Sequence, residues 1–357
     1  MEAPNLIQIR GRGAAENPPN RFERIEYVPD MDAYDPDDEP APQTMVFRDA
    51  TKKIIARNDS PDVGFEFSIN PYRGCEHGCI YCYARPTHEY FGLSAGLDFE
   101  TKIFAKPDAA QLLRKELMAP KWRGDLIAIS GVTDCYQPLE RKLKITRSCL
   151  EVLLEFRNPT ALITKSHLIT RDVDLLAEMA QYDGVGVSIS ITSLRNEVQR
   201  VMEPRTSVPA RRLEAVTTLA KAGVPVNVMV APVVPGLTDH EIPAILKAAK
   251  AAGASSAGYI TLRLPFAVKE LFERWLERHF PDRKDKVLNR VRELRDGRLY
   301  DPTFGVRMRG EGVFADQIEA LFDTTARKLG LNERLMKHSS AAFRRPPRGG
   351  QLALFDT

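Results

Sequence analysis

Residues 73–83 read Arg73-Gly74-Cys75-Glu76-His77-Gly78-Cys79-Ile80-Tyr81-Cys82-Tyr83 and hold three of the five cysteines in the chain. Cys75, Cys79 and Cys82 are spaced C-x3-C-x2-C, so one short loop carries all three thiolates. Soft thiolates suit iron–sulfur clusters, and three of them can hold three corners of a [4Fe–4S] cube. The fourth iron then lacks a protein ligand and is open to a substrate or cofactor. Gly74 and Gly78 let the chain turn tightly enough for the three sulfurs to converge.

Two other chemistries are compatible with clustered cysteines. A structural zinc site usually has four protein ligands, and His77 or His88 is a candidate for the fourth. Zinc-binding cysteine pairs normally need a second pair, however, and the remaining Cys135 and Cys149 stand alone. A disulfide framework is disfavoured because the number of cysteines is odd and secretory features are absent. The open iron–sulfur cluster is therefore the favoured interpretation.

Length and charge set broad limits. The 357 residues have room for one large α/β domain with extensions, and 51 basic against 48 acidic residues leave bulk charge uninformative about partners. The sequence has no apolar run long enough to span a membrane and no apolar signal-peptide core near Met1–Arg10. Thiolates that hold a cluster require a reducing compartment, so a soluble cytoplasmic protein is expected.

Residues 1–60 are expected to form a largely flexible N-terminal extension. Asn17-Pro18-Pro19-Asn20 interrupts regular structure, and residues 30–42 are acidic and proline-rich with no basic residue. Such a segment buries too little apolar surface to offset the entropy lost on ordering, which is typical of a solvated tether. A short apolar patch at Met45-Val46-Phe47 is expected to pack on the domain that follows.

From residue 65 onward, β-branched runs alternate with amphipathic helical patterns. Strands are predicted at 66–70, 126–130, 161–164, 185–191, 224–230 and 259–264. Helices are predicted at 108–118, 144–156, 172–181, 209–222 and 239–252. This alternation is typical of βα units around a parallel sheet, and six units make a partial (β/α)6 TIM-like barrel, of the α/β class, over residues 61–265. The cysteine loop follows the first strand, at the carboxyl end where such barrels place their chemistry.

Residues 266–335 change to helical patterns. Three apolar stripes are expected to close the open side or the bottom of the barrel: Leu271, Phe272, Trp275 and Leu276; Val287, Val291 and Leu294; and Phe314, Ile318, Leu321 and Phe322. Residues 269–309 contain twelve basic and eight acidic side chains. This excess is compatible with a nucleic-acid surface, but a solvated helical face explains it equally well.

The cysteine motif, written C-x3-C-x-Tyr-C, resembles the signature of the radical S-adenosylmethionine (SAM) superfamily. In that superfamily the amino and carboxylate groups of SAM chelate the open iron. An electron from the cluster splits the sulfonium into methionine and a 5′-deoxyadenosyl radical, which abstracts hydrogen. Over about residues 65–265, three strand-end segments are also similar to the spore photoproduct lyase family of DNA-repair-photolyase-like proteins: Thr133-Asp134, Thr164-Lys165-Ser166 and Ser188-Ile189-Ser190.

The resemblance implies a set of SAM-binding residues: Tyr81, Thr133, Asp134, Lys165, Ser188, Ser190 and Arg205. Lys165 would pair with the SAM carboxylate as a point charge, Asp134 would accept from the ammonium, and Tyr81 would pack beside the adenine. The hydroxyls would bind the methionyl or ribose end, and the arginine an anionic group. Ordinary explanations remain open: a solvated lysine, hydroxyls that satisfy strand-end backbone groups, and an arginine in a salt bridge.

One departure from the lyase family concerns the hydrogen donor. In that family a cysteine three residues before the aspartate returns a hydrogen atom to the product radical, and the matching residue here is Gly131. Cys135, directly after Asp134, would need a local rearrangement to reach the site, and a buried thiol is the commoner fate of a lone cysteine. Tyr83 matches a tyrosine beside the hydrogen-transfer site, so Tyr83 and Cys135 are the candidate catalytic residues.

Residues 336–357 are expected to form a flexible basic tail. After Arg344-Arg345-Pro346-Pro347-Arg348-Gly349-Gly350 the chain ends in Gln351-Leu352-Ala353-Leu354-Phe355-Asp356-Thr357. Residues 351–355 resemble the pentapeptide that docks bacterial repair proteins on the DNA-polymerase sliding clamp. The resemblance implies Gln351, Leu352, Leu354 and Phe355 as contacts, presented by a tether. The alternative is an apolar C-terminal segment that folds back on its own domain.

Three functions are compatible with these patterns. The favoured one is a radical SAM enzyme that acts on nucleic acid, most of all on DNA in lyase-like lesion repair. The second is a radical SAM enzyme that modifies RNA, a protein or a small molecule, for which the barrel and cluster would look the same. The third is a non-catalytic iron–sulfur adaptor bound to the sliding clamp; the predicted open iron, surrounded by polar residues, argues against it.

Overall fold

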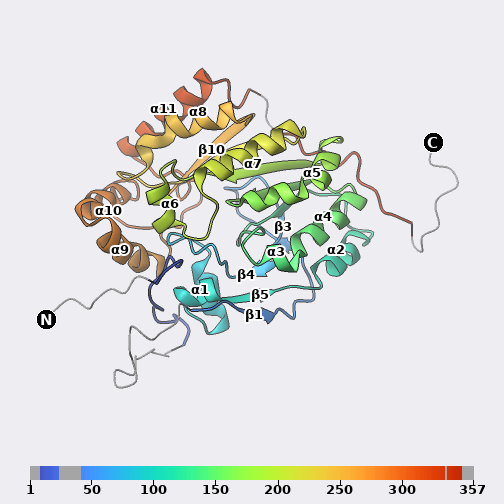
Figure 1. Cartoon of the computed structure of the whole chain (residues 1–357), viewed down its shortest axis with the longest axis horizontal. Helices are drawn as coiled ribbons and strands as arrows, with labels where there is room; N and C mark the ends of the chain where they lie inside the picture. The colour runs from blue at the N-terminus through green and yellow to red at the C-terminus, as the bar shows by residue number, and fades with distance from the viewer. Residues whose placement is uncertain (1–8, 24–41, 334–335, 348–357) are drawn as a thin grey trace.

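The computed structural model describes residues 9–23, 42–333 and 336–347. Within these residues the main sheet runs in the order β10-β9-β8-β7-β6-β3-β2 (Figure 1). Neighbouring strands from β3 to β10 are parallel, and β2 is antiparallel to β3. Their bounds are β2 Ala56–Arg57, β3 Phe67–Ile69, β6 Ile127–Ile129, β7 Thr160–Thr164, β8 Val185–Ser190, β9 Val226–Val233 and β10 Ser256–Thr261. The predicted partial (β/α)6 barrel is confirmed.

Helices cover the outer face of this sheet. The long crossover helices are α2 Ala109–Leu117, α4 Ile145–Glu155, α5 Val173–Ala180, α7 Pro209–Lys221 and α8 Ile242–Ala251. Shorter turns complete the crossovers: α3 Glu140–Leu143, η2 His167–Asp172, α6 Asn196–Met202 and η3 Asp239–Glu241. Each long helix buries an apolar stripe, as Leu150 and Leu153 of α4 illustrate. Because helices cover the outer face of the sheet, apolar residues predominate in its strands.

The last barrel strand begins earlier than predicted. β10 spans Ser256–Thr261, whereas the sequence pattern favoured residues 259–264. Its register against β9 shifts between Tyr259 and Thr261, and Leu262 and Leu264 are buried beyond the strand. The apolar pattern in the sequence therefore continues past the end of the strand pairing. The start of β10 was missed because Gly258 interrupts the apolar pattern there.

A second, smaller sheet lies next to the cysteine loop. Strand β1 (Met45–Arg48) pairs in parallel with β5 (Lys102–Ala105), which pairs antiparallel with β4 (Tyr72–Arg73). The turns η1 (Arg85–Phe91) and α1 (Leu97–Thr101) connect the cysteine loop to β5. The apolar patch of β1 is only partly covered: Phe47 packs on Phe104, yet the whole strand is exposed. This sheet supports the cysteine loop from the side opposite the barrel.

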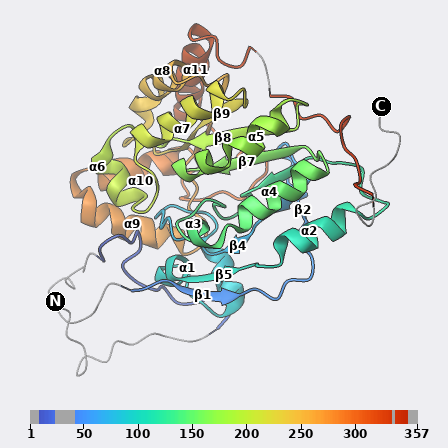
Figure 2. The same cartoon turned by 45° about the vertical axis from the view of Figure 1, so that its right-hand side comes forward.

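Part of the expected N-terminal extension is ordered. Residues 9–23 pack against the domain, with Ala14 buried, and in both views they run between α1 and α9 (Figures 1 and 2). Their contacts include long-range hydrogen bonds to residues 89–100. The helix-breaking composition predicts flexibility, but in the structure it accompanies a fixed irregular segment over residues 9–23. The acidic stretch lies outside the described residues, except for Pro42.

The C-terminal helices are α9 (Val268–His279), η4 (Pro281–Arg283), α10 (Lys284–Glu293) and α11 (Val313–Lys328). The stripe on α9 is buried, and its Trp275 Nε1 donates to the carbonyl oxygen of Val201 at 3.0 Å. The stripe on α10 is buried as predicted. On α11 the prediction is wrong for Leu321, which is 38% exposed, because Ile318 and Phe322 already cover the contact with the barrel.

Residues 336–347 also pack on the domain, although the sequence favoured a flexible tail. The amide of Ser339 donates to the carbonyl oxygen of Asp183 at 3.0 Å, and the amide of Arg344 donates to the carbonyl oxygen of Phe156 at 2.9 Å. Both acceptors precede barrel strands, so this segment crosses the end of the barrel that is remote from the cysteine loop. The clamp-like residues Gln351, Leu352, Leu354 and Phe355 lie outside the described residues. No helix in the described ranges has the length and hydropathy needed to cross a membrane.

Candidate active site

The cysteine loop follows β4 and is held by backbone hydrogen bonds. The amide of Cys75 donates to the carbonyl oxygen of Phe99 at 2.9 Å, and the amide of Cys82 donates to the carbonyl oxygen of Cys79 at 3.2 Å. Cys75 and Cys79 are buried, and Cys82 is half-buried. Gly78 has a φ of +65°, and a Cβ there would lie 2.6 Å from a carboxylate oxygen of Glu100. Both the backbone conformation and the packing against Glu100 therefore require a glycine at this sharp turn, as predicted.

Burial in the protein sets the protonation chemistry of the loop thiols. Burial raises the pKa of Cys75 well above its ordinary value, with smaller contributions from Asp134 and from the other two cysteines of the loop. Burial likewise raises the pKa of Cys79, which favours the protonated thiol. Metal ligation requires thiolates, so binding of a metal centre would displace the proton from each thiol. His77 Nδ1 lies 3.3 Å from Asp134, and His88 Nε2 lies 2.9 Å from the carbonyl oxygen of Lys102.

A buried arginine fastens the loop. Arg85 is fully buried and donates to the carbonyl oxygens of Cys79 at 2.9 Å and Gly78 at 3.2 Å. It also forms a 2.5 Å ion pair with Glu100, whose side chain is fully buried. A buried charge is tolerated when it is paired and hydrogen-bonded on all sides. The loop thus depends on two charged residues that follow the motif.

A cavity of about 490 Å³ opens beside the loop, at the carboxyl ends of the barrel strands. Five predicted site residues line it: Tyr81, Tyr83, Lys165, Ser188 and Ser190. The cavity occupies the position where barrels of this type bind substrates and cofactors.

Lys165 and Tyr81 form the wall of the cavity nearest the cysteine loop, called here the inner wall. Lys165 Nζ lies 5.9 Å from the centre of the Tyr81 ring and, among the described residues, has no carboxylate within ion-pair distance. The Tyr81 hydroxyl donates to Glu203, which forms a buried ion pair with Arg212. The ring is therefore fixed, while the ammonium group is available to an anionic ligand.

The two serines lie on β8. The Ser188 hydroxyl accepts a hydrogen bond from Asn227 Nδ2 at 3.1 Å, which leaves its own proton available to a ligand. Ser190 is buried, and its carbonyl oxygen accepts from Arg212 at 2.9 Å. Both positions therefore belong to the cavity wall, and their role as SAM ligands stays a prediction.

Three predicted ligands are engaged by the protein itself. Thr133 Oγ1 donates to the carbonyl oxygen of Tyr72 at 2.8 Å, and Arg205 forms an ion pair with Glu76 at 3.2 Å. Asp134 accepts from Thr164 Oγ1 at 2.7 Å and from the Lys165 amide at 2.8 Å. None of the three lines the cavity, so their role as SAM ligands stays a prediction.

The pKa of Asp134 shows how strongly this carboxylate is held. Burial opposes its ionisation, but the charge and hydrogen bond of His77, together with hydrogen bonds from Lys165 and Thr164, lower the pKa to about 2. The carboxylate therefore joins the cysteine loop to the end of β7. It fixes the start of the segment that carries the Lys165 side chain.

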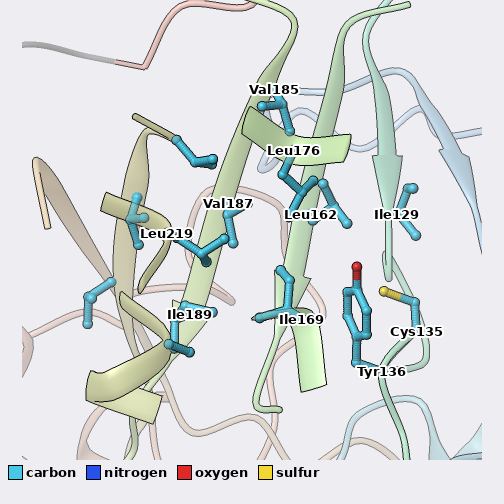
Figure 3. Close-up of a cluster of buried hydrophobic side chains, with 14 of the residues drawn as sticks. Ile129, Cys135, Tyr136, Leu162, Ile169, Leu176, Val185, Val187, Ile189 and Leu219 are labelled. Carbon is cyan, nitrogen blue, oxygen red and sulfur yellow. The ribbon is translucent and has the colours of Figure 1, made fainter. Parts of the chain in front are cut away.

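The two candidate catalytic residues differ in position. Cys135 is fully buried and packs with Ile129 and Tyr136 in the apolar core, away from the cavity lining (Figure 3). Tyr83 lines the cavity, and its hydroxyl donates to the carbonyl oxygen of Gly131 at 2.6 Å. The structure thus places at the cavity both the tyrosine and the glycine that stands where the lyase family has its cysteine.

The outer wall of the cavity was not anticipated. It comprises the loop 62–65 and a set of residues from β10 and the C-terminal region: Tyr259, Thr261, Arg263, Met308 and Arg309. Arg263 lies over the Tyr83 ring at 5.3 Å, and its Nε is buried without a hydrogen-bond partner among the described residues. Its position after the last barrel strand was the available signal, because polar residues at strand ends face the mouth of a barrel.

A partial barrel with a three-cysteine loop at the carboxyl ends of its strands defines a class of enzymes in which an iron–sulfur cluster lies beside a bound cofactor. A family model described as the Radical SAM superfamily matches residues 69–249. The chain belongs to this superfamily, and its cofactors are a [4Fe–4S] cluster and SAM.

Similar proteins and structures support the assignment. An uncharacterized protein of Mycobacterium tuberculosis is 37% identical over 248 residues, which cover 69% of this chain and 72% of that protein. An uncharacterized protein of Methanocaldococcus jannaschii is 26% identical over 228 residues, with 64% and 82% covered. Spore photoproduct lyase complexed with dinucleoside spore photoproduct has a TM-score of 0.57 at 18% identity, with 80% of each chain covered. At this identity the last comparison establishes the fold.

Proposed function

We propose that this radical SAM enzyme acts on damaged DNA in a lyase-type repair reaction. The observation that carries the proposal is the cavity with two unlike walls. Lys165 stands beside the cluster loop, and Arg263 stands over Tyr83 on the outer wall. A lesion-bearing dinucleotide has the matching features, namely planar bases and a phosphodiester.

The inner wall suits SAM. Lys165 is available to a carboxylate, the Tyr81 ring offers a flat face to an adenine, and Ser188 retains a proton to donate. When bound, the cluster and SAM supply a reductive cleavage that generates a hydrogen-abstracting radical. The protein's contribution is orientation and the exclusion of water, which the paired charges behind this wall make possible.

The outer wall suits a nucleotide. An arginine guanidinium without a carboxylate partner can bind a phosphate by donating charge-assisted hydrogen bonds to it. The neighbouring arginines are less available, because Arg307 pairs with Asp62 and Arg309 lies 3.4 Å from Glu319. The half-exposed Tyr83 ring offers a stacking surface for a base that is turned out of the helix. Fold similarity to a lyase whose solved structure holds a dinucleoside spore photoproduct supports the same substrate class.

The test is SAM cleavage with defined DNA. The full chain is purified without oxygen, its cluster is reconstituted and reduced, and 5′-deoxyadenosine is quantified with no DNA, with intact DNA and with UV-irradiated DNA. A Cys79→Ala variant treated in the same way is the control for cluster-dependent turnover. We expect cleavage that requires Cys79 and that increases with irradiated DNA, together with loss of the lesion in mass spectra of the digested DNA.

The other outcomes separate the alternatives. Cysteine-dependent cleavage that ignores DNA would contradict a DNA substrate and direct the search toward RNA, protein or small molecules. Absence of cleavage by a protein with full iron and sulfide content would contradict the enzymatic function and support the adaptor hypothesis.

A further inference from the structure

We propose that residues 9–20, called here the N-terminal strap, are part of the cluster site. The strap lies outside the region matched by the family model, residues 69–249. It contacts the cysteine loop directly at Gly13 and indirectly through Glu100 and Arg85. Its role is to hold the loop in the conformation that binds the cluster and to cover it from solvent.

The direct contact is a close approach of two backbones. A Cβ built on Gly13 would lie 1.8 Å from the carbonyl oxygen of Gly78 and 3.3 Å from the amide nitrogen of Ile80. Backbone atoms cannot yield to such a contact, so glycine is required at this point of the strap. The next residue, Ala14, is 3% exposed and packs in the same apolar cluster as Cys79 and Ile80.

The indirect contact passes through a buried carboxylate. The amides of Gly13 and Ala14 donate to the two carboxylate oxygens of Glu100 at 3.0 and 2.8 Å. The same carboxylate forms the ion pair with Arg85, which in turn donates to the carbonyl oxygen of Cys79. Without the strap this buried charge would lose two of its donors, which is costly in an apolar environment. The strap, the ion pair and the cysteine loop thus form one hydrogen-bonded unit.

The strap is fastened at both sides of the cluster region. The Glu16 carbonyl oxygen accepts from the amide of Leu97 at 3.1 Å, and the Glu16 carboxylate forms an ion pair with Arg274 of α9. Asn17 and Asp98 exchange hydrogen bonds, with the Asp98 amide donating at 2.9 Å. Figure 2 shows this segment in dark blue between α1 and α9. These anchors explain why the proline-containing segment is ordered.

The experiment compares two glycine-to-alanine variants of the full chain. Gly13→Ala introduces the backbone clash, whereas Gly64→Ala is the matched control, since the backbone of Gly64 is not in the left-handed region and no atom lies within 4 Å of its built Cβ. Both proteins are reconstituted without oxygen, and iron and sulfide content, thermal unfolding, and the rate at which air bleaches the cluster absorption are measured. If the clash makes opening of the loop about 1.4 kcal/mol easier, bleaching becomes about tenfold faster.

We expect Gly13→Ala to keep the fold, to hold less iron and to bleach about tenfold faster than wild type, while the control keeps wild-type values. Equal iron content and equal bleaching in the two variants would overturn the proposal. If Gly13→Ala fails to fold, hydrogen exchange of the wild-type holoprotein decides. The strap amides of residues 13–14 and the loop amides of residues 78–79 must then gain protection together on cluster binding; independent exchange would overturn it. These readouts need no DNA, so they stand apart from the proposed substrate.

Discussion

The two walls of the cavity are built differently. Behind the inner wall, charged groups are paired deep in the protein: Arg85 with Glu100, and Arg212 with Glu203. The outer wall consists of the loop 62–65 and the segments after β10, and Arg263 there has no carboxylate partner among the described residues.

The difference indicates a division of labour. Paired, hydrogen-bonded charges fix side chains before a ligand arrives, which suits a cofactor that must be oriented in the same way in every turnover. A partly exposed arginine and tyrosine without such support suit a substrate that enters and leaves. Substitutions in the buried ion pairs behind the inner wall should therefore lower stability. Substitutions of inner-wall side chains that line the cavity should weaken cofactor binding, and substitutions on the outer wall should weaken substrate binding.

The largest effect is expected at the buried ion pair. Arg85→Met leaves Glu100 charged and unpaired in the interior, which costs about 3–5 kcal/mol of unfolding free energy. Urea unfolding of the reduced chain without its cluster measures this loss. The control is Arg114→Met, which breaks an exposed pair with Glu155 and is expected to cost less than about 1 kcal/mol. Similar losses in the two variants would contradict the rigid character of the inner wall.

Lys165→Ala is expected to weaken SAM binding with little effect on stability. A charge-assisted contact is worth about 1.5–3 kcal/mol, so the dissociation constant of SAM should rise about 10- to 100-fold. Equilibrium binding of SAM to the reconstituted protein tests this, with Lys221→Ala at the end of α7 as the control. An unchanged affinity would remove this lysine from the cofactor site.

Arg263→Gln is expected to weaken DNA binding by about 1 kcal/mol or more and to lower the slope of log K against log salt by about one. The charge is lost, but the planar amide keeps much of the packing against Tyr83. Anisotropy titrations with a labelled lesion oligonucleotide at several salt concentrations provide both numbers. The matched variant is Arg292→Gln on the exposed face of α10. If that variant has the larger effect, the nucleic-acid surface lies on the C-terminal helices instead.

The smallest effect is expected at the glycine that replaces the family's cysteine. A Cβ on Gly131 would meet Ser68 at 3.4 Å, an ordinary contact, so Gly131→Cys should change stability by less than about 1 kcal/mol. The new thiol faces the cavity and should react quickly with an alkylating reagent, whereas the buried Cys135 should react only when the core opens. Peptide mapping by mass spectrometry measures both rates. Rapid labelling of Cys135 in the native protein would revive it as a hydrogen donor.

Patterns that repeat locally were predictable, and contacts between distant segments were not. The barrel strands follow from β-branched runs because burial favours apolar residues along most of each strand. The cysteine loop, Lys165 and the two serines of β8 follow from motif and strand-end position. The sequence pattern did not indicate Arg263, because the predicted strand extended to residue 264 whereas β10 ends at Thr261. It did not indicate the strap either, because the residues that stabilise the strap are far along the chain. Asp134 and Thr133 stay predictions as SAM ligands, because the protein itself engages their polar atoms.

The ion pair between Glu16 and Arg274 joins residues that are 258 positions apart. A contact of this sequence separation forms only after α9 has been synthesised and has folded onto the barrel. The cysteine motif, by contrast, leaves the ribosome within the first quarter of the chain. If the strap retains the cluster, stable cluster binding is therefore expected only after the chain has been extended through α9. Truncation before α9 should then yield a protein that loses iron readily even though all three cysteine ligands are present.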